Sequence, residues 1–208
     1  MITLHRFRDL LDAAMREYEV RIELEQRDLL PMAVLLADKL VGALLARTNG
    51  PKPTLYAARM TDDSDRKWVI KQLRNTKYNS SGGECMIDVY VCRGNKDPFK
   101  PVVTMECEGY LGHARHVTRD ASSESCDYLW DLFKLLQVPS PLRVFLAITT
   151  MGKVKQLEEL VANQVQEYQH CRDNTDVILS GVFPGAVFHD KAINLTWWQG
   201  ADRESLIL

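Results

Sequence analysis

The sequence predicts an α/β fold in which a mixed central sheet is flanked by helices on both faces. Three observations lead to this prediction. Two amphipathic helical patterns, at about 3–26 and 29–47, open the chain. Two stretches with alternating side chains, 84–93 and 102–110, are typical of paired strands. A nearly all-apolar run at 140–149 follows a further helical pattern, as expected for a buried parallel strand reached through a crossover helix.

The composition is that of an ordinary globular protein. The chain has 208 residues, of which 46% are hydrophobic and 26% are charged, so it can bury a sizeable core. We expect a single domain over 1–208, with an N-terminal helical part at 1–50 and a sheet core at 80–208. The formal net charge of −2 excludes a protein held to nucleic acid or to anionic membranes by its overall charge.

No segment is typical of a membrane or secreted protein. The longest apolar-rich stretch, 31–46, is too short to span a bilayer and contains Asp38 and Lys39. The amphipathic N-terminus lacks the continuous apolar segment of a signal peptide. The five cysteines are scattered and show no C-x-x-C spacing, which is typical of reduced thiols. We therefore expect a cytoplasmic protein with no membrane partner.

The first half of the chain predicts two helices and one ambiguous segment. The helix at 3–26 has a single apolar stripe at three- and four-residue steps. Pro31 suits the first turn of the helix at 29–47, and the sequence "TNGP" stops it. Residues 54–75 stay open: "TLYAARM" is compatible with a strand, and "DRKWVIKQL" with a strand or a short helix.

The second half predicts alternating strands and helices. The strands at 84–93 and 102–110 are close enough in sequence to form an antiparallel hairpin. A helix capped by Ser122 or Ser123 then leads to the apolar strand at 140–149. The remaining segments are a helix at 151–169 and two final strands, "DVILSGVFP" and "FHDKAINLTWW". The adjacent Trp197 and Trp198 must face opposite sides of the last strand.

Three carboxylates gather on the predicted hairpin. Side chains alternate along a strand, so Glu106 and Glu108 share one face and Cys107 points to the other. Two neighbouring carboxylates repel unless a cation or a proton lies between them. Asp88 lies on the first hairpin strand and can approach both glutamates. Such oxygen ligands suit Mg²⁺ or Mn²⁺, although the solvated face of a hairpin explains them as well.

The order of these elements resembles the core of the PD-(D/E)xK nucleases, the restriction-endonuclease-like superfamily. In that family a strand with Asp and a partner strand with Glu-x-Lys are followed by an amphipathic helix and an apolar strand, and the stretch 84–149 is similar. The resemblance implies that Asp88 and Glu106 are catalytic and hold the metal. Glu108 stands where the family usually has Lys, as in some restriction enzymes. The added helix glutamate of the family would be Glu19.

Cationic groups near the scissile phosphate are also implied by the resemblance. A missing lysine can come from elsewhere, and Lys134 on the outward side of its helix is one candidate. An exposed ion pair with Asp131, three residues away, explains the same lysine without catalysis. Arg115 and His116 belong to the basic loop 112–120, which in a nuclease would lie near the phosphate. A polar surface loop is the alternative.

The resemblance implies a metal-dependent nuclease that hydrolyses phosphodiester bonds in DNA with Mg²⁺ (or Mn²⁺). Glu108 would then orient or deprotonate the attacking water, and the protein would act as a homodimer. The alternative is a catalytically inactive nuclease-fold protein that binds another protein as an accessory factor. The missing lysine and the absence of a basic excess favour that alternative. A nucleotide-handling enzyme that uses the same carboxylates is a third reading.

Overall fold

The chain is described from a computed structural model. The described residues are 2–19, 27–46, 50–58, 60, 62–79, 87–93, 101–108, 110–111, 124–149, 151–171, 176–184 and 193–208.

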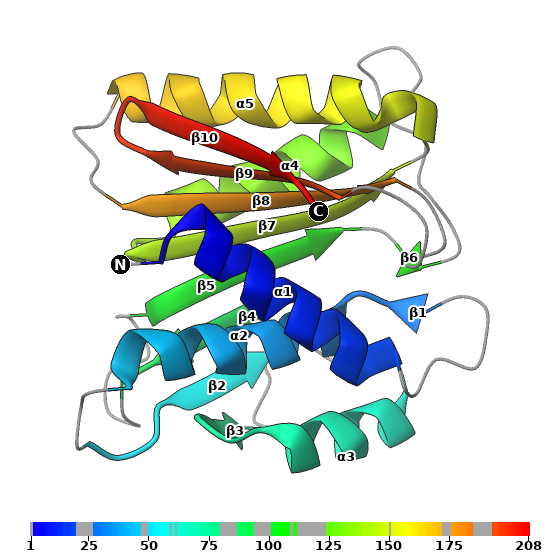
Figure 1. Ribbon diagram of the computed structural model, residues 1–208, viewed down its shortest axis with the longest axis vertical. Helices are drawn as coiled ribbons and strands as arrows, with labels where there is room; N and C mark the ends of the chain where they lie inside the picture. Colours follow the sequence, from blue (N-terminus) through cyan, green and yellow to red (C-terminus); the bar gives the residue numbers. More distant parts are fainter. Residues whose placement is uncertain are drawn as a thin grey trace.

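The described strands form an eight-stranded mixed sheet, which confirms the α/β class (Figure 1). From one edge to the other the strands are β10 (Asp202–Ile207), β9 (Asn194–Gln199), β8 (Val177–Pro184), β7 (Leu142–Thr149), β5 (Pro101–Glu108), β4 (Val89–Cys92), β2 (Thr54–Ala57) and β3 (Lys77–Asn79). The β4–β5 hairpin is antiparallel and β5–β7 is parallel, as predicted. A second, two-stranded sheet pairs β1 (Arg27–Asp28) with β6 (Tyr110–Leu111).

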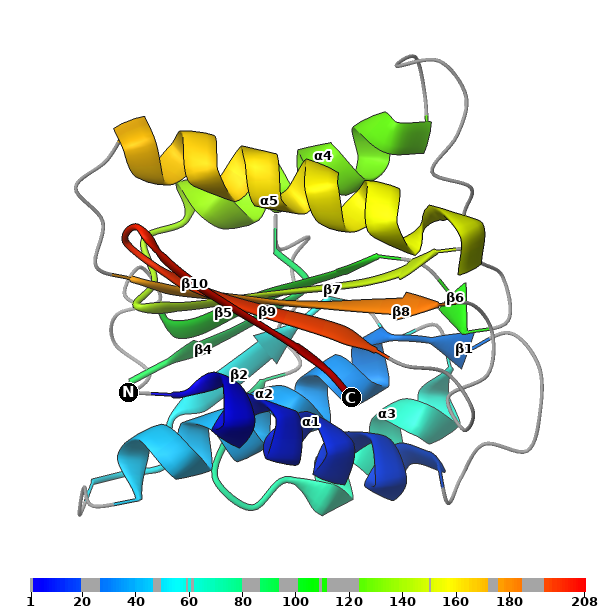
Figure 2. The same ribbon diagram turned by 45° about the horizontal axis from the view of Figure 1, so that its top comes forward.

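Helices cover both faces of the sheet, as the sequence predicts (Figure 2). The helices are α1 (Leu4–Glu19), α2 (Leu30–Leu45), α3 (Asp63–Gln72), α4 (Glu124–Gln137) and α5 (Val154–Cys171), the last preceded by a 3₁₀ turn (Met151–Lys153). The first three lie on one face, and α4 and α5 lie on the other. Because α4 links two parallel strands, it crosses over one face of the sheet.

The strand alternation separates two apolar cores. On β4 and β5, Val89, Val91, Val103 and Met105 join the core beneath α1 and α2. On the other face, Phe145 of β7 joins the core beneath α4 and α5. The even-numbered residues of β5 from Thr104 onward therefore face α4, and this decides where the predicted carboxylates lie.

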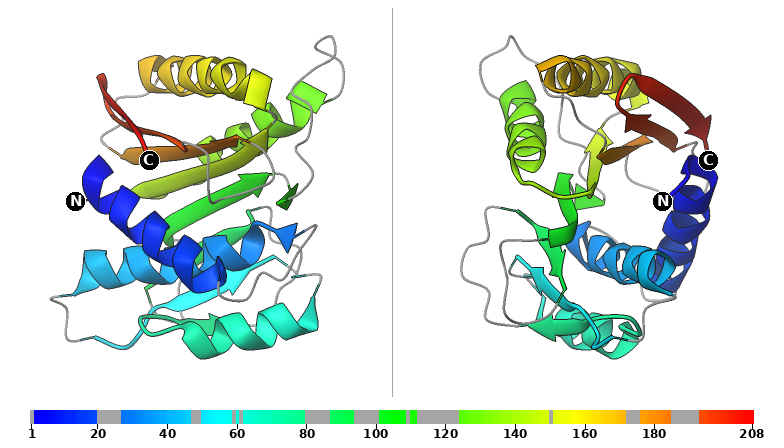
Figure 3. Two further views of the ribbon diagram at one scale, coloured as in Figure 1. Left: turned by 45° about the vertical axis from the view of Figure 1, so that its right-hand side comes forward. Right: turned by 90° about the vertical axis from the view of Figure 1, so that its left-hand side faces the viewer.

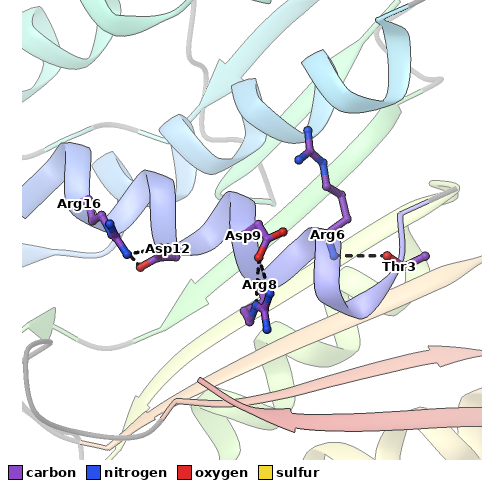
Figure 4. Close-up of polar contacts among 6 residues, drawn as sticks. All are labelled: Thr3, Arg6, Arg8, Asp9, Asp12 and Arg16. Atoms are coloured by element: carbon purple, nitrogen blue, oxygen red, sulfur yellow. Dashed lines mark hydrogen bonds and ion pairs between the residues drawn. The ribbon is translucent and has the colours of Figure 1, made fainter.

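The amphipathic pattern of α1 is confirmed over Leu4–Glu19. Its apolar stripe is buried, with Phe7, Leu11 and Tyr18 fully covered. The outer side carries exposed ion pairs, Arg8–Asp9 at 2.7 Å and Arg16–Asp12 at 2.9 Å (Figure 4). Thr3 Oγ1 accepts a hydrogen bond from the Arg6 backbone N–H at 3.3 Å, so the helix begins with a side-chain cap.

Residues 54–75, which the sequence left open, contain one strand and one helix. Thr54–Ala57 forms β2, and Asp63–Gln72 forms α3. Asp62 caps α3 by accepting from the backbone N–H groups of Ser64 and Asp65. The strands β2 and β3 also extend the main sheet into a region that precedes the predicted sheet core at 80–208.

The last strand, β10, was not predicted. Its residues Asp202, Arg203 and Glu204 are exposed, so the segment lacks the apolar alternation from which strands are recognised. Charged side chains are common on edge strands, where they oppose pairing with other chains. The two tryptophans do face opposite ways: Trp198 is buried beneath α5, and Trp197 packs toward α1.

No helix in the described part of the chain is long and apolar enough to cross a membrane.

A buried aspartate ties α2 to the turn before β3. Asp38 is only 4% exposed, and its carboxylate accepts hydrogen bonds from the backbone N–H groups of Arg74, Asn75 and Thr76 at 2.8–3.1 Å. The Asn75 amide and the Thr76 hydroxyl donate to the same carboxylate at 3.0 and 2.7 Å. A side chain at Gly42, one turn further along α2, would come within 2.6 Å of Asn75. Asp38, which interrupts the apolar stretch in the sequence, therefore holds the turn on α2.

The Asp38→Ala substitution is expected to lower the free energy of unfolding by roughly 3 to 5 kcal/mol, because it leaves several buried donors unsatisfied. Urea denaturation measures this change. Asp12→Ala, which removes a surface ion pair on α1, is the matched control and should cost below about 1 kcal/mol. Equal effects of the two substitutions would contradict the role given to Asp38.

Candidate functional site

The candidate site is built around the buried carboxyl group of Glu106. This side chain is 1% exposed and lies on the β5 face that is covered by α4. Lys134 of α4 places its Nζ atom 3.1 Å from Glu106 Oε1. On the other side, Glu106 Oε2 accepts a long 3.4 Å hydrogen bond from the Asp88 backbone N–H. The solvated hairpin face, an alternative drawn from the sequence, is therefore wrong for Glu106.

Asp88 lies beside Glu106, at the residue before β4. Its backbone carbonyl accepts a hydrogen bond from the Ala58 N–H at 2.7 Å, which extends the β2–β4 pairing by one step. Its carboxylate Oδ2 accepts from the Cys107 backbone N–H at 2.9 Å, with the Cys107 thiol at 3.4 Å. The Asp88 side chain is thus held against β5 by Cys107, the residue after Glu106.

The surroundings of Glu106 favour its protonated form. Burial is the main cause, and the neighbouring Asp88 carboxylate adds repulsion and a hydrogen bond to the neutral form. Lys134 opposes both effects, yet the pKa of Glu106 rises to about 9. At neutral pH, Glu106 therefore favours its protonated form, which is less costly to bury and is not repelled by Asp88.

Lys134 is held between two acids and does not point outward. Its Nζ atom lies 2.6 Å from Asp131 Oδ1, in addition to the contact with Glu106, and its side chain is 21% exposed. Burial lowers the pKa of Lys134, but Asp131 and Glu106 together raise it to about 12. The predicted outward position of Lys134 is wrong, because this flank of α4 faces β5. The predicted ion pair with Asp131 is present, and it balances the lysine charge while Glu106 keeps its proton.

The other predicted site residues are less fully placed. Glu108 is the last residue of β5, half-buried, on the same face as Glu106. Glu19 is the last residue of α1, and its side chain is not among those described. Arg115 and His116 lie outside the described residues. The sequence predicts Asp131 only as a surface partner of Lys134. Its i,i+3 spacing from Lys134 is the pattern that links it to the site.

The residues around Glu106 offer two converging carboxyl groups. Among the described residues, no group of three or more His, Cys, Asp or Glu side chains is placed to hold a metal ion. Mg²⁺ is often held by only one or two carboxylates together with water and substrate phosphates. Asp88 and Glu106 carry hard oxygen donors of the kind that Mg²⁺ and Mn²⁺ prefer.

A separate pocket lies at the other end of the strands. It has a volume of about 410 Å³, and its walls include Leu44, Leu45, Leu142 and Val177. Arg93 and Asp176 supply charged groups to its lining. None of the predicted site residues lines this pocket, so it is distinct from the cluster around Glu106.

Comparison with known proteins gives no match: no family model, no curated protein and no solved structure is similar to this chain.

The raised pKa of Glu106 predicts a pH-dependent stability. Because the pKa in the folded protein, about 9, lies above the ordinary value of 4.5, the stabilising protonation is complete below about pH 4.5 and is lost as the pH rises toward 9. The free energy of unfolding should fall across this range by up to about 1.4 kcal/mol per pH unit. Glu106→Gln, which keeps the neutral shape, should remove that loss.

Urea denaturation of the wild type and Glu106→Gln at pH 5, 7 and 9 measures the effect. Glu159→Gln on the exposed side of α5 is the control, and its curve should follow the wild type. Parallel curves for the wild type and Glu106→Gln would show that Glu106 is ionised in the folded protein.

Proposed function

We propose that this protein hydrolyses phosphodiester bonds in DNA, with Asp88 and Glu106 holding Mg²⁺ or Mn²⁺. The observation that carries the proposal is the position of Lys134, 3.1 Å from the buried carboxyl of Glu106. An Asp, a Glu and a Lys, the three residue types of the PD-(D/E)xK motif, are thereby brought together. The lysine comes from α4, while Glu108 occupies its usual place on the strand.

The order of the elements supports the same proposal. The antiparallel β4–β5 hairpin, the crossover helix α4 and the parallel strand β7 follow one another as in the resemblance drawn from the sequence. In this arrangement Asp88 comes from the residue before β4, Glu106 comes from β5, and Lys134 comes from the helix that covers β5. A catalytic group on a packed helix is held as firmly as one on a strand.

Each residue would have a separate part in the reaction. A cation held by Asp88 and Glu106 would lower the pKa of a bound water and neutralise charge on the phosphate. Lys134 remains charged and would stabilise negative charge that develops on the phosphate oxygens. Glu108, on the same face as Glu106, would orient the attacking water or take its proton. Asp131 would keep the Lys134 side chain in place.

One observation favours the second candidate, a nuclease-fold protein without catalysis that binds another protein. Asp131 already pairs with Lys134 at 2.6 Å, so charge is compensated within the cluster when Glu106 is protonated. Such a network stabilises α4 on the sheet without any reaction. The two candidates differ in whether a cation replaces the proton.

The first test is titration calorimetry with Mn²⁺ at pH 8. The wild type should bind the ion and release a proton, because the cation displaces the proton of Glu106. Asp88→Asn and Glu106→Gln should both lose binding. If the wild type binds no Mn²⁺, with or without DNA, the proposed nuclease is contradicted and the non-catalytic binding protein is favoured.

Hydrolysis of DNA is the second measurement. Lys134→Met should lower the rate with Mn²⁺ by roughly 10²-fold or more, because one preorganised charge is lost. The matched control is Lys155→Met, which removes an exposed lysine of α5 from an ion pair with Glu159 and should not change the rate. Equal rates for the wild type and Lys134→Met would exclude Lys134 from the reaction.

A further inference from the structure

A pair of stacked tyrosines lies on the sheet next to the carboxylates. Tyr56 of β2 and Tyr90 of β4 are direct partners in the sheet register. Their ring centres are 4.6 Å apart and their planes differ by 6°. Leu55 and Val89, their neighbours in sequence, point into the core beneath α1 and α2. Both tyrosines therefore lie on the face that carries Glu106.

The tyrosine pair lies on strands that neighbour the candidate site in the sheet. Asp88 lies two residues before Tyr90 in the chain. Tyr90 pairs with Thr104 of β5, which lies two residues before Glu106. The described helices of this layer, α4 and α5, pack on β5, β7 and β8 (Figure 3). Both tyrosines are half-buried.

A second aromatic pair lies on α4. Trp130 and Phe133 are 61% and 43% exposed, and their rings stack with centres 5.8 Å apart. Trp130 is four residues before Lys134, so the two side chains are neighbours on the helix surface. Among the described residues, the two rings form an exposed aromatic surface on α4. The Asp88, Glu106 and Lys134 cluster is thus accompanied by aromatic pairs on the sheet and on the helix.

We infer that the DNA strand taken by this site is single-stranded, with unpaired bases stacking on Tyr56–Tyr90 and on Trp130–Phe133. The inference rests on the proposed phosphodiester hydrolysis. In a duplex the faces of the bases are stacked on one another and cannot reach a protein ring. In a single strand each base offers a face, and stacking on an aromatic side chain is sequence-tolerant.

The charge of the protein points in the same direction. With a net charge of −2, general attraction to phosphates contributes little, so binding has to come from other contacts. Aromatic stacking on unpaired bases supplies contacts of that kind, beside the charge of Lys134. A base stacked on Trp130 would lie one helical turn from Lys134.

The test measures binding and hydrolysis separately. Binding of a fluorescein-labelled thymidine oligomer and of its duplex with an adenosine oligomer is followed by anisotropy in EDTA. The single strand should bind at least about tenfold more tightly. Trp130→Ala and Tyr90→Leu should each weaken its binding about fivefold or more. Hydrolysis of both substrates by the wild type is then followed with Mn²⁺.

Two matched variants control for indirect effects. Tyr78→Leu changes a half-buried tyrosine that packs on the opposite face of the sheet, and Ile70→Ala removes an exposed apolar side chain of α3. Both should bind the single strand as the wild type does. Near-ultraviolet circular dichroism confirms that each variant is folded.

The outcomes separate the two proposals. Equal affinity for the single strand and the duplex, or unchanged binding by Trp130→Ala and Tyr90→Leu, overturns the single-strand inference. Faster hydrolysis of the duplex overturns it as well. Preferential and aromatic-dependent binding without any hydrolysis overturns the proposed nuclease activity and leaves the strand preference in place.

Discussion

The burial of the Glu106 carboxyl group between the sheet and α4 is the constraint on which the rest of the site depends. A carboxylate that is 1% exposed is costly unless it is neutralised by a proton, a cation or a lysine. Asp88 and Lys134 are both in contact with it, and they act in opposite directions on its ionisation. Its protonation state consequently determines the net charge of the cluster that Asp88, Glu106, Asp131 and Lys134 form.

The two apolar cores hold this cluster in position. Val89 and Met105 fix the hairpin against α2, which leaves Asp88 and Glu106 on the opposite face. The apolar side of α4 packs against β7 in the second core, which turns the Asp131–Lys134 flank toward β5. Polar residues are thus brought together by the packing of apolar ones, and displacement of α4 would separate the lysine from the carboxyl pair. The same packing leaves Trp130 and Phe133 on the outer side of the helix.

The sequence predicted the parts of this arrangement that follow from the side-chain periods of strands and helices. The alternation of β5 placed Glu106 opposite Cys107, and the closeness of the two strands in sequence predicted that Asp88 would approach Glu106. The edge strand β10 could not be predicted, because its exposed residues are charged and show no apolar alternation. Its conformation is determined by its pairing with β9. The role of Asp38 escaped as well, because its hydrogen-bond donors are more than 35 residues away in sequence.

By itself, the sequence determined the α/β class, the hairpin, the parallel crossover and the face that carries the acidic residues. These follow from local patterns, since a period of two or 3.6 residues fixes which side chains are buried together. Only the tertiary structure decided that Lys134 faces Glu106, that Glu106 is buried and protonated, and that Tyr56 stacks on Tyr90. Each of these depends on how elements distant in the chain pack, and the resulting burial raises the pKa of the Glu106 carboxyl group to about 9.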